Sequence, residues 1–355
     1  MNQKIYLIAK NLKKQISNYQ FDLYQQRDAK KRLKNIELVK GKTDRKLIKL
    51  SDEYAKDVFG WIGYAPWLYA YSAMAETFKE GWIPDNYYGK VVIPKLQGDY
   101  GKLSFLKATT TNLFDNSVFP DIVYYANGLF NSSYNQVISE TNLKKYLFKN
   151  TKTVVFKKDY SLQGLGVFFF DKNSFEIKQI HRLGNGVFQE FIHQHPFFEE
   201  FITSSVSTLR ITTVIDNNGI ASVKASFIRM GQKNDTHVNA VTDIIVAVNI
   251  YTGELDEFGY VDNWQPLDRH PDTKIKFSKK RIPAFNKCVK TALELHRKVP
   301  FVRCIGWDMT VDKEENVKVM EWNGYHNDIK FCEATQGPCF SDLGWENLWR
   351  QAKNK

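Results

Sequence analysis

The sequence predicts an α+β protein in which a helical, basic N-terminal region precedes a small antiparallel lobe and a larger α+β lobe. Residues 3–39 carry apolar side chains at helical spacing, and residues 153–192 read as short strands separated by glycine-containing turns. Longer strand-like runs follow from residue 205. At 355 residues the chain can form more than one core, because single cores stop growing near ~250–300 residues.

These changes in pattern divide the chain into four expected parts. Residues 1–95 form a helical, basic and aromatic N-terminal region, and residues 96–150 form a connecting helical part of the core. Residues 151–195 form a lid lobe with a glycine-containing loop, and residues 196–355 form the C-terminal lobe. In the C-terminal lobe we expect strands at residues 208–215, 221–230 and 242–249 and a helix over residues 283–298.

The first element is expected to be a long amphipathic helix or a pair of helices. Its apolar residues recur three and four positions apart, as Ile5, Ile8, Leu12, Ile16, Tyr19 and Leu23. Residues 1–49 contain 14 Lys/Arg and 4 Asp/Glu, a balance of +10 that leaves +1 of the total of +11 for the remainder. This local excess indicates a face that meets an anionic phospholipid, nucleic acid or polysaccharide; a solvated lysine-rich helix is the plain alternative.

Two features bear on the compartment of the protein. The four cysteines have no zinc-like spacing, and the short apolar run after Met1 is unlike a secretory signal, so we expect reduced thiols and a cytoplasmic location. Residues 58–75 carry no charge, but Gly60, Gly63 and Pro66 interrupt them. That pattern favours a buried or interfacial segment over a membrane span.

A strand-loop-strand pattern near the C-terminus predicts an acidic hairpin. A four-residue loop pairs Asp312 with Val317, and this register puts Asp308 opposite Glu321 with Asn323 on the same face. Two carboxylates this close repel each other, and a divalent cation removes the repulsion. Two carboxylates and an amide suit Mg²⁺ shared with substrate phosphates. The alternative is a solvent-facing hairpin whose charges diverge or pair with lysines.

A second candidate site is Lys157, which ends an apolar strand just before the loop of residues 161–166. Glycines let loop amides approach phosphate oxygens closely, and the ammonium group neutralises their charge. The pattern lacks the GxxxxGK[ST] motif, so it is not a P-loop. Lys158 is expected to be the solvated neighbour, although a shift of strand register would exchange the two lysines.

Taken in this order, the segments resemble the ATP-grasp superfamily. Residues 157–166 resemble its glycine-rich flap, and residues 189–192 resemble its hinge strand beside the adenine. Lys107 resembles the lysine that binds the nucleotide at an earlier position in this family. The resemblance therefore implies that the nucleotide is bound by Lys107, Lys157, Ser161, Gly164, Gly166, Gln189, Glu190 and Ile192. The ribose ligand stays open among His193, His195 and Glu199.

The resemblance also implies the catalytic and metal-binding residues. Residues 208–211 resemble the "DIRV" strand and residues 227–230 a later arginine strand, which makes Arg210 and Arg229 the catalytic residues that neutralise the transferring phosphoryl group. Thr208 departs from the family, which often has an acid there. The expected cofactors are ATP and Mg²⁺, with two ions held by Asp308, Glu321 and Asn323.

More narrowly, residues 187–195, 205–210 and 306–308 are similar to the sugar-transfer-associated ATP-grasp branch. This implies a carboxylate–amine ligase: a carboxylate attacks the γ-phosphate to give an acyl phosphate, and an amine then displaces phosphate to give an amide. The expected partners are a uronic acid or other carboxylated sugar, as a precursor of surface or capsular polysaccharide, and an amine or amino acid. The basic N-terminal region would contact an anionic membrane peripherally at its inner surface.

Two other functions stay open at this point. An ATP-grasp kinase would stop at phosphoryl transfer to a sugar or another hydroxyl. A basic nucleic-acid-binding protein would use the first 49 residues, but it leaves the acidic hairpin unexplained, so no nucleic-acid partner is expected. The catalytic base stays open among His181, His193, His195 and His237.

Overall fold

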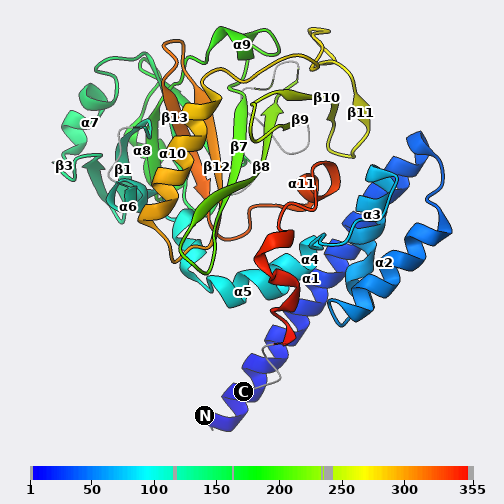
Figure 1. Cartoon of the computed structure of the whole chain (residues 1–355). Helices are drawn as coiled ribbons and strands as arrows, with labels where there is room; N and C mark the ends of the chain where they lie inside the picture. Colours follow the sequence, from blue (N-terminus) through cyan, green and yellow to red (C-terminus); the bar gives the residue numbers. More distant parts are fainter. Residues whose placement is uncertain (1–2, 115–117, 162–163, 233–234, 236–242, 351–355) are drawn as a thin grey trace. The chain divides into compact units, whose positions relative to one another are not determined.

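The computed structural model describes residues 3–114, 118–161, 164–232, 235 and 243–350 (Figure 1). The chain divides into two compact units. The first comprises Met1–Gly98, Asn263–Gln265 and Asp328–Lys355, and the second comprises Asp99–Asp262 and Pro266–Asn327. The N-terminal helical segment and the C-terminal segment therefore belong to one unit, and the two β-sheets belong to the other.

The first unit is helical. Its elements are α1 (Gln3–Lys40), α2 (Arg45–Asp57), η1 (Ile62–Tyr64), α3 (Ala65–Ala75), α4 (Asp85–Tyr87), η2 (Tyr88–Val92), α5 (Ile93–Leu96), α11 (Lys330–Thr335), η5 (Ser341–Leu343) and η6 (Trp345–Asn347). The expected long helix is thus one continuous element, because residues 3–40 contain no proline or glycine to interrupt it.

Helix α3 lies at the centre of the first unit. Trp67, Leu68 and Tyr71 are fully buried on it, and Pro66 occupies its first turn, where no intrahelical N–H donor is needed. The uncharged residues 58–75 are therefore largely part of a core, as their aromatic and small side chains predict. Among the helices of the described residues, none is long and apolar enough to cross a membrane.

The second unit contains a six-stranded antiparallel sheet after three short helical elements, η3 (Tyr100–Phe105), η4 (Lys107–Thr109) and α6 (Thr110–Phe114). Its strands in spatial order are β3 (Val137–Ile138), β2 (Leu129–Ser132), β1 (Asp121–Ala126), β6 (Gly186–Glu190), β4 (Thr153–Lys158) and β5 (Val167–Asp171). Helices α7 (Glu140–Leu147) and α8 (Ile177–Leu183) contribute to the core of this sheet through Leu143, Leu147 and Ile180.

Residues 96–150, expected as a helical connection, are only partly helical. They supply β1, β2 and β3, which join the strands of the lid to form one sheet. The local signal for this hairpin is Asn127-Gly128, where both residues have positive φ angles of 51° and 87°. An Asn-Gly pair favours a tight turn between antiparallel strands, and the sequence prediction gave it no weight.

The seven-stranded antiparallel sheet forms the larger lobe of the second unit. In spatial order its strands are β11 (Pro266–Leu267), β10 (Leu255–Tyr260), β9 (Ile244–Val248), β8 (Ala221–Met230), β7 (Thr208–Ile215), β12 (Cys304–Val311) and β13 (Val317–Asn323). Helix α10 (Phe285–Lys298) covers one face, with Phe285, Ala292 and Leu295 in the same core as the strands (Figure 1). The short helix α9 (Pro196–Glu199) precedes β7.

The register of the acidic hairpin β12–β13 differs from the prediction near its loop. Val311, rather than Asp312, pairs with Val317. The Asp312 carboxylate accepts hydrogen bonds from the backbone N–H groups of Glu314 and Asn316, at 3.1 and 2.8 Å, so it closes the loop instead of extending the ladder. An irregularity between Asp308 and Met309 then compensates for the shift of one residue.

The compensating irregularity leaves Asp308 opposite Glu321, as predicted, although the predicted register at the loop was wrong. Met309 pairs with Val319, so Met320 has no partner across the ladder. Its carbonyl accepts hydrogen bonds from Lys157 and Gln189 of the six-stranded sheet, at 3.2 and 3.1 Å. The bulge thus links the hairpin to the other sheet of the same unit.

Candidate active site

Lys107 faces Glu321 across a small pocket of the second unit. Its Nζ lies 3.4 Å from Glu321 Oε1, and its side chain is only 8% exposed, whereas that of Glu321 is 29% exposed. The backbone N–H of Lys107 donates to Asp159 Oδ1 at 2.9 Å, which fixes the start of η4 beside the end of β4. The acidic hairpin therefore pairs with a lysine, but the carboxylate of Glu321 still reaches the pocket.

Lys157 approaches the same hairpin from β4. Its Nζ donates to the Met320 carbonyl at 3.2 Å, and Lys158 beside it is exposed, as expected for the solvated neighbour. Burial lowers the pKa of Lys157; Glu321 opposes this shift, and the positive charge of Lys107 adds to it. The like charges of Lys107 and Lys157 near one hairpin favour an anionic ligand there.

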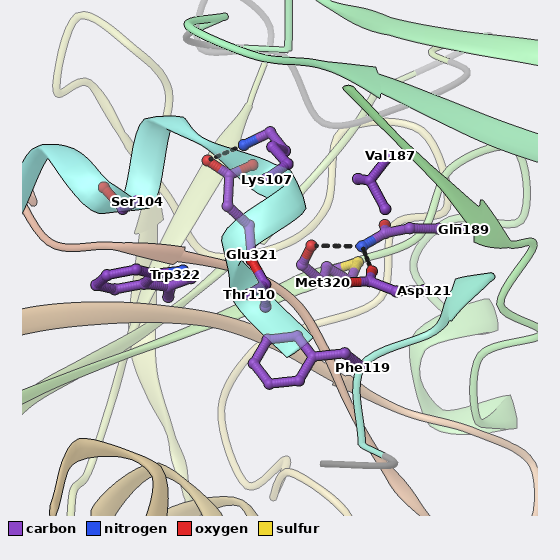
Figure 2. A pocket seen from close by; sticks show the side chains of 10 residues that line it. All are labelled: Ser104, Lys107, Thr110, Phe119, Asp121, Val187, Gln189, Met320, Glu321 and Trp322. Atoms are coloured by element: carbon purple, nitrogen blue, oxygen red, sulfur yellow. Dashed lines mark hydrogen bonds and ion pairs between the residues drawn. The ribbon is translucent and has the colours of Figure 1, made fainter. Parts of the chain in front are cut away.

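Gln189 and Asp121 form the wall of this pocket on the β1–β6 side. Gln189 Nε2 donates to Asp121 Oδ1 at 2.7 Å and to the Met320 carbonyl (Figure 2). Tyr124 donates to the other oxygen of Asp121 at 2.6 Å. Burial raises the pKa of Asp121, and the hydrogen bonds from Tyr124 and Gln189 oppose the shift. The pocket is lined by Ser104, Lys107, Thr110, Phe119, Asp121, Val187, Gln189, Met320, Glu321 and Trp322.

Asp308 lies beside Glu321 and forms a bidentate salt bridge with Arg210 of the neighbouring strand β7. Arg210 donates from Nε to Asp308 Oδ1 at 2.5 Å and from Nη2 to Oδ2 at 2.8 Å, while Nη1 donates to the Asn327 carbonyl at 3.1 Å. Asn323 Nδ2 also donates to Asp308 Oδ2, at 3.1 Å. Burial opposes ionisation, but the guanidinium groups and Asn323 keep the pKa of Asp308 below its usual value.

Arg229 is the second arginine near Asp308, and it differs from Arg210 in its bonding. It lies on β8 with its guanidinium 5.1 Å from the ring centre of Phe227, and its positive charge lowers the pKa of Asp308. Its Nε is buried and has no hydrogen-bond partner among the described residues. Arg210 already makes a bidentate pair with Asp308. Arg229 is therefore the arginine whose Nε can donate to an anion.

Like Lys157, the remaining predicted nucleotide ligands lie outside the lining of this pocket. Ser161 donates to the Lys158 carbonyl at 2.6 Å, and Gly166 accepts from the Lys158 N–H at 2.9 Å, so both shape the turn after β4. Gly164 has a φ of +80°, and residues 162–163 lie outside the described residues. The side chain of Glu190 is exposed at the end of β6, and Ile192 is half-buried beyond it.

The histidines leave the base and the ribose ligand undecided. His195 accepts from the Phe197 N–H through Nδ1, at 3.1 Å, and so caps α9. His181 lies 3.1 Å from Glu140 in the lid, and His237 lies outside the described residues. His193 is exposed next to Phe191, whose ring centre is 5.3 Å away.

Asp121 and Met320 are among the pocket residues that the sequence analysis did not predict. Asp121 follows a proline in a segment that the sequence analysis assigned to a helical connection. Met320 contributes a backbone carbonyl, and no side-chain pattern predicts which carbonyl a bulge leaves without a partner in its ladder. The Asn127-Gly128 turn could have placed Asp121 on a strand, whereas the role of Met320 depends on the bulge alone.

The residues present suit ATP and Mg²⁺. Asp308, Glu321 and Asn323 offer hard oxygen donors on one face of the hairpin, and Mg²⁺ is commonly bound by one or two carboxylates together with substrate phosphates. Within the described residues, no group of three or more His, Cys, Asp or Glu side chains is placed to hold a metal ion. The Nε of Arg229, which has no hydrogen-bond partner among the described residues, suits a phosphate oxygen. So do the ammonium groups of Lys107, which lines the pocket, and of Lys157, which donates to the Met320 carbonyl.

Comparison with known solved structures gives matches of low identity. Biotin carboxylase from Campylobacter jejuni, in a β,γ-ATP complex, is 11% identical, with a TM-score of 0.41 over 68% of this chain and 45% of its own. The MgADP-bound biotin carboxylase domain from Hydrogenobacter thermophilus is 10% identical, with a TM-score of 0.43 over 72% and 46%. D-alanine–D-alanine ligase from Coxiella burnetii is 10% identical, with a TM-score of 0.39 over 71% and 60%.

The chain thus spans about half of the length of the first two structures. No curated protein matches the sequence. The family comparison is specific: residues 180–343 match the sugar-transfer associated ATP-grasp family. This segment contains the hinge strand, both arginine strands and the acidic hairpin, so the match confirms the resemblance stated from the sequence. The chain carries a sugar-transfer-associated ATP-grasp region over residues 180–343.

Proposed function

We propose that this chain is an ATP- and Mg²⁺-dependent carboxylate–amine ligase that acts on a uronic acid or another carboxylated sugar in surface polysaccharide synthesis. The observation that carries the proposal is the convergence of Lys107 and Lys157 on the hairpin that bears Asp308 and Glu321. The description of the matched family supports a sugar as the carboxylate substrate.

The proposed reaction has two steps. An oxygen of the substrate carboxylate attacks the γ-phosphorus of ATP, and the bond from that phosphorus to ADP breaks. The amine nitrogen then attacks the acyl carbon, the bond to phosphate breaks, and the nitrogen loses a proton. ATP, carboxylate and amine thus become ADP, phosphate and amide. Such chemistry depends on positioning and on charge neutralisation more than on covalent help from the protein.

The side chains divide these tasks in the proposal. Lys107 and Lys157 bind phosphate oxygens, and a bound anion relieves the repulsion between the two ammonium groups. Asp308, Glu321 and Asn323 hold Mg²⁺, which supplies charge neutralisation when bound. Arg229 meets the transferring phosphoryl group, while Arg210 orients Asp308 through its two hydrogen bonds.

The test combines ATP consumption with product analysis. The purified protein is incubated with ATP, Mg²⁺, free or nucleotide-linked glucuronic and galacturonic acids, and a panel of amino acids. We expect phosphate release that requires both an acid and an amine, and a product whose mass equals their sum less one water. A phosphorylated hydroxyl would instead assign the protein to the ATP-grasp kinases. Amide formation only with carboxylates that are not sugars would overturn the sugar assignment.

A further inference from the structure

We propose that one exposed side of α1 is a docking surface for an anionic lipid bilayer. The surface, here called the α1 row, consists of Leu12, Ile16, Tyr19, Arg27, Lys30 and Lys34. These residues follow one another at helical steps of three and four, with Leu23 filling the one longer step, so they share a side of the helix. The proposal does not depend on the ligase reaction.

The opposite side of α1 packs within the first unit. Ala29 and Ile36 are 0% and 2% exposed there, and Gln25 donates to Asp85 and accepts from Trp67, both at 3.0 Å. The apolar members of the α1 row behave differently: Leu12, Ile16 and Tyr19 are 56%, 51% and 65% exposed. From Asp22 onward, packing within the described part of the chain covers one side of α1, and it leaves the six residues of the row exposed.

The α1 row also keeps its positive charge. The helix has three acidic residues, and each is already paired: Asp22 with Lys90 at 2.5 Å, Asp28 with Arg32 at 3.1 Å, and Glu37 with Lys42 at 2.8 Å. Arg27, Lys30 and Lys34 are exposed, and none has an acidic partner within 4 Å among the described residues. The sequence adds four lysines and no acid before residue 22.

An anionic bilayer matches both halves of the row at once. Apolar side chains of an interfacial helix enter the boundary between headgroups and acyl chains, and cations pair with anionic headgroups. The row extends over ~33 Å of helix at 1.5 Å per residue, which is long enough to contact several lipids. In a dimer with parallel α1 helices, the three cations of one row would face the same three cations of the other, and like-charge repulsion opposes this arrangement.

The proposal is tested by sedimenting the full chain with vesicles. We expect binding to phosphatidylcholine vesicles that contain phosphatidylserine, and little binding to phosphatidylcholine alone. Replacing Arg27, Lys30 and Lys34 by Gln together should weaken partitioning by on the order of 100-fold, because each cation near an anionic surface contributes about one kilocalorie per mole. The matched control replaces Lys144 and Lys145 of α7 and Lys149, which follows this helix, by Gln; all three lysines are exposed, and this variant should keep wild-type binding.

The apolar half is tested separately. Leu12→Ser with Ile16→Ser should reduce partitioning at least ~10-fold, while Leu129→Ser with Ile220→Ser, which are similarly exposed in the other unit, should not. Circular dichroism and ATP-binding calorimetry check that each variant folds. Absence of vesicle binding, equal binding to neutral vesicles, or equal loss in the control variants would overturn the proposal. A second result would also overturn it: light scattering shows that the wild type is a dimer that does not bind vesicles, and only the Leu12/Ile16 variant is a monomer.

Discussion

Glu321 and Glu333 lie close together in the sequence, but their surroundings differ. Glu321 belongs to the second unit, has Lys107 as its cationic partner and reaches a pocket with a side chain that is 29% exposed. Glu333 belongs to the first unit and is 0% exposed. It accepts hydrogen bonds from the backbone N–H groups of Ile83 and Cys339, at 2.7 and 2.8 Å.

The comparison separates two uses of an acidic side chain, one partly exposed and one buried. A carboxylate with a cationic neighbour and an open side can exchange that neighbour for a ligand, so its charge is available for binding. A carboxylate whose two oxygens both accept main-chain N–H groups cross-links segments of the fold instead. Burial raises the pKa of Glu333 to about 8, against the hydrogen bonds that lower it. For Asp308, near Glu321, arginines shift the pKa in the opposite direction.

The largest expected effect is on turnover at the site. Glu321→Ala should reduce ATP consumption by on the order of 10³-fold, because it removes charge that holds the phosphates and metal in the proposed site. Its melting temperature should stay near that of the wild type, since no backbone N–H of the described residues donates to the Glu321 carboxylate. The measurement is phosphate release together with a thermal melt.

Glu314→Ala is the matched control for this change, because Glu314 is an exposed acid in the loop of the same hairpin. It should leave turnover unchanged. The assignment of Glu321 is falsified if its Ala variant retains near-normal ATP consumption with the substrates that the wild type uses.

An intermediate effect is expected for nucleotide affinity. Lys157→Ala should weaken ATP binding by on the order of 10- to 100-fold, the range for losing a hydrogen bond to a charged group. Lys158→Ala, one residue away and exposed, should bind ATP like the wild type. Calorimetric titration with ATP and Mg²⁺ measures both. Equal affinities in the two variants would remove Lys157 from the nucleotide site.

The last expected effect lies outside the site: a pH dependence of stability that originates at Glu333. Its folded pKa of about 8 exceeds the ordinary glutamate pKa of 4.5, so between these values the folded state binds a proton that the unfolded state has released. The free energy of unfolding should therefore fall as pH rises through this window, by up to ~1.4 kcal/mol per pH unit, and this contribution ends above the folded pKa.

Glu333→Gln isolates this contribution because the amide does not titrate. In this variant the side-chain NH2 group would face a backbone N–H, and two donors cannot form a hydrogen bond. The variant should therefore be less stable than the wild type at pH near 5. The difference should narrow as the pH approaches about 8. Denaturant unfolding at a series of pH values measures it, and parallel curves for the two proteins would contradict the assignment.

The elements that the sequence predicted well are those with strong periodicity. The strand of residues 208–215 and the helix near residues 283–298 were placed to within two residues, because alternation and helical spacing are local properties of the chain. The acidic hairpin was recognised for the same reason. Its loop was misplaced by one residue, since the hydrogen bonds of Asp312 compete with strand pairing and periodicity carries no information about them.

The sequence by itself determined the residue types of the site and their order, from Lys107 through Lys157 and the arginines to Glu321. It did so because a nucleotide-binding site requires cationic side chains for the phosphates and carboxylate oxygens for the metal ion. Their order along the chain can be read without coordinates. It also located the excess charge of residues 1–49.

Only the tertiary structure decided how those groups divide the work. It paired Arg210 with Asp308, left Arg229 Nε without a partner among the described residues, and turned the Met320 carbonyl toward Lys157. It also added Asp121 to the pocket, from a strand that the sequence analysis had not recognised. Each of these outcomes depends on contacts between residues far apart in the chain, and the local periodicity of the sequence does not predict such contacts.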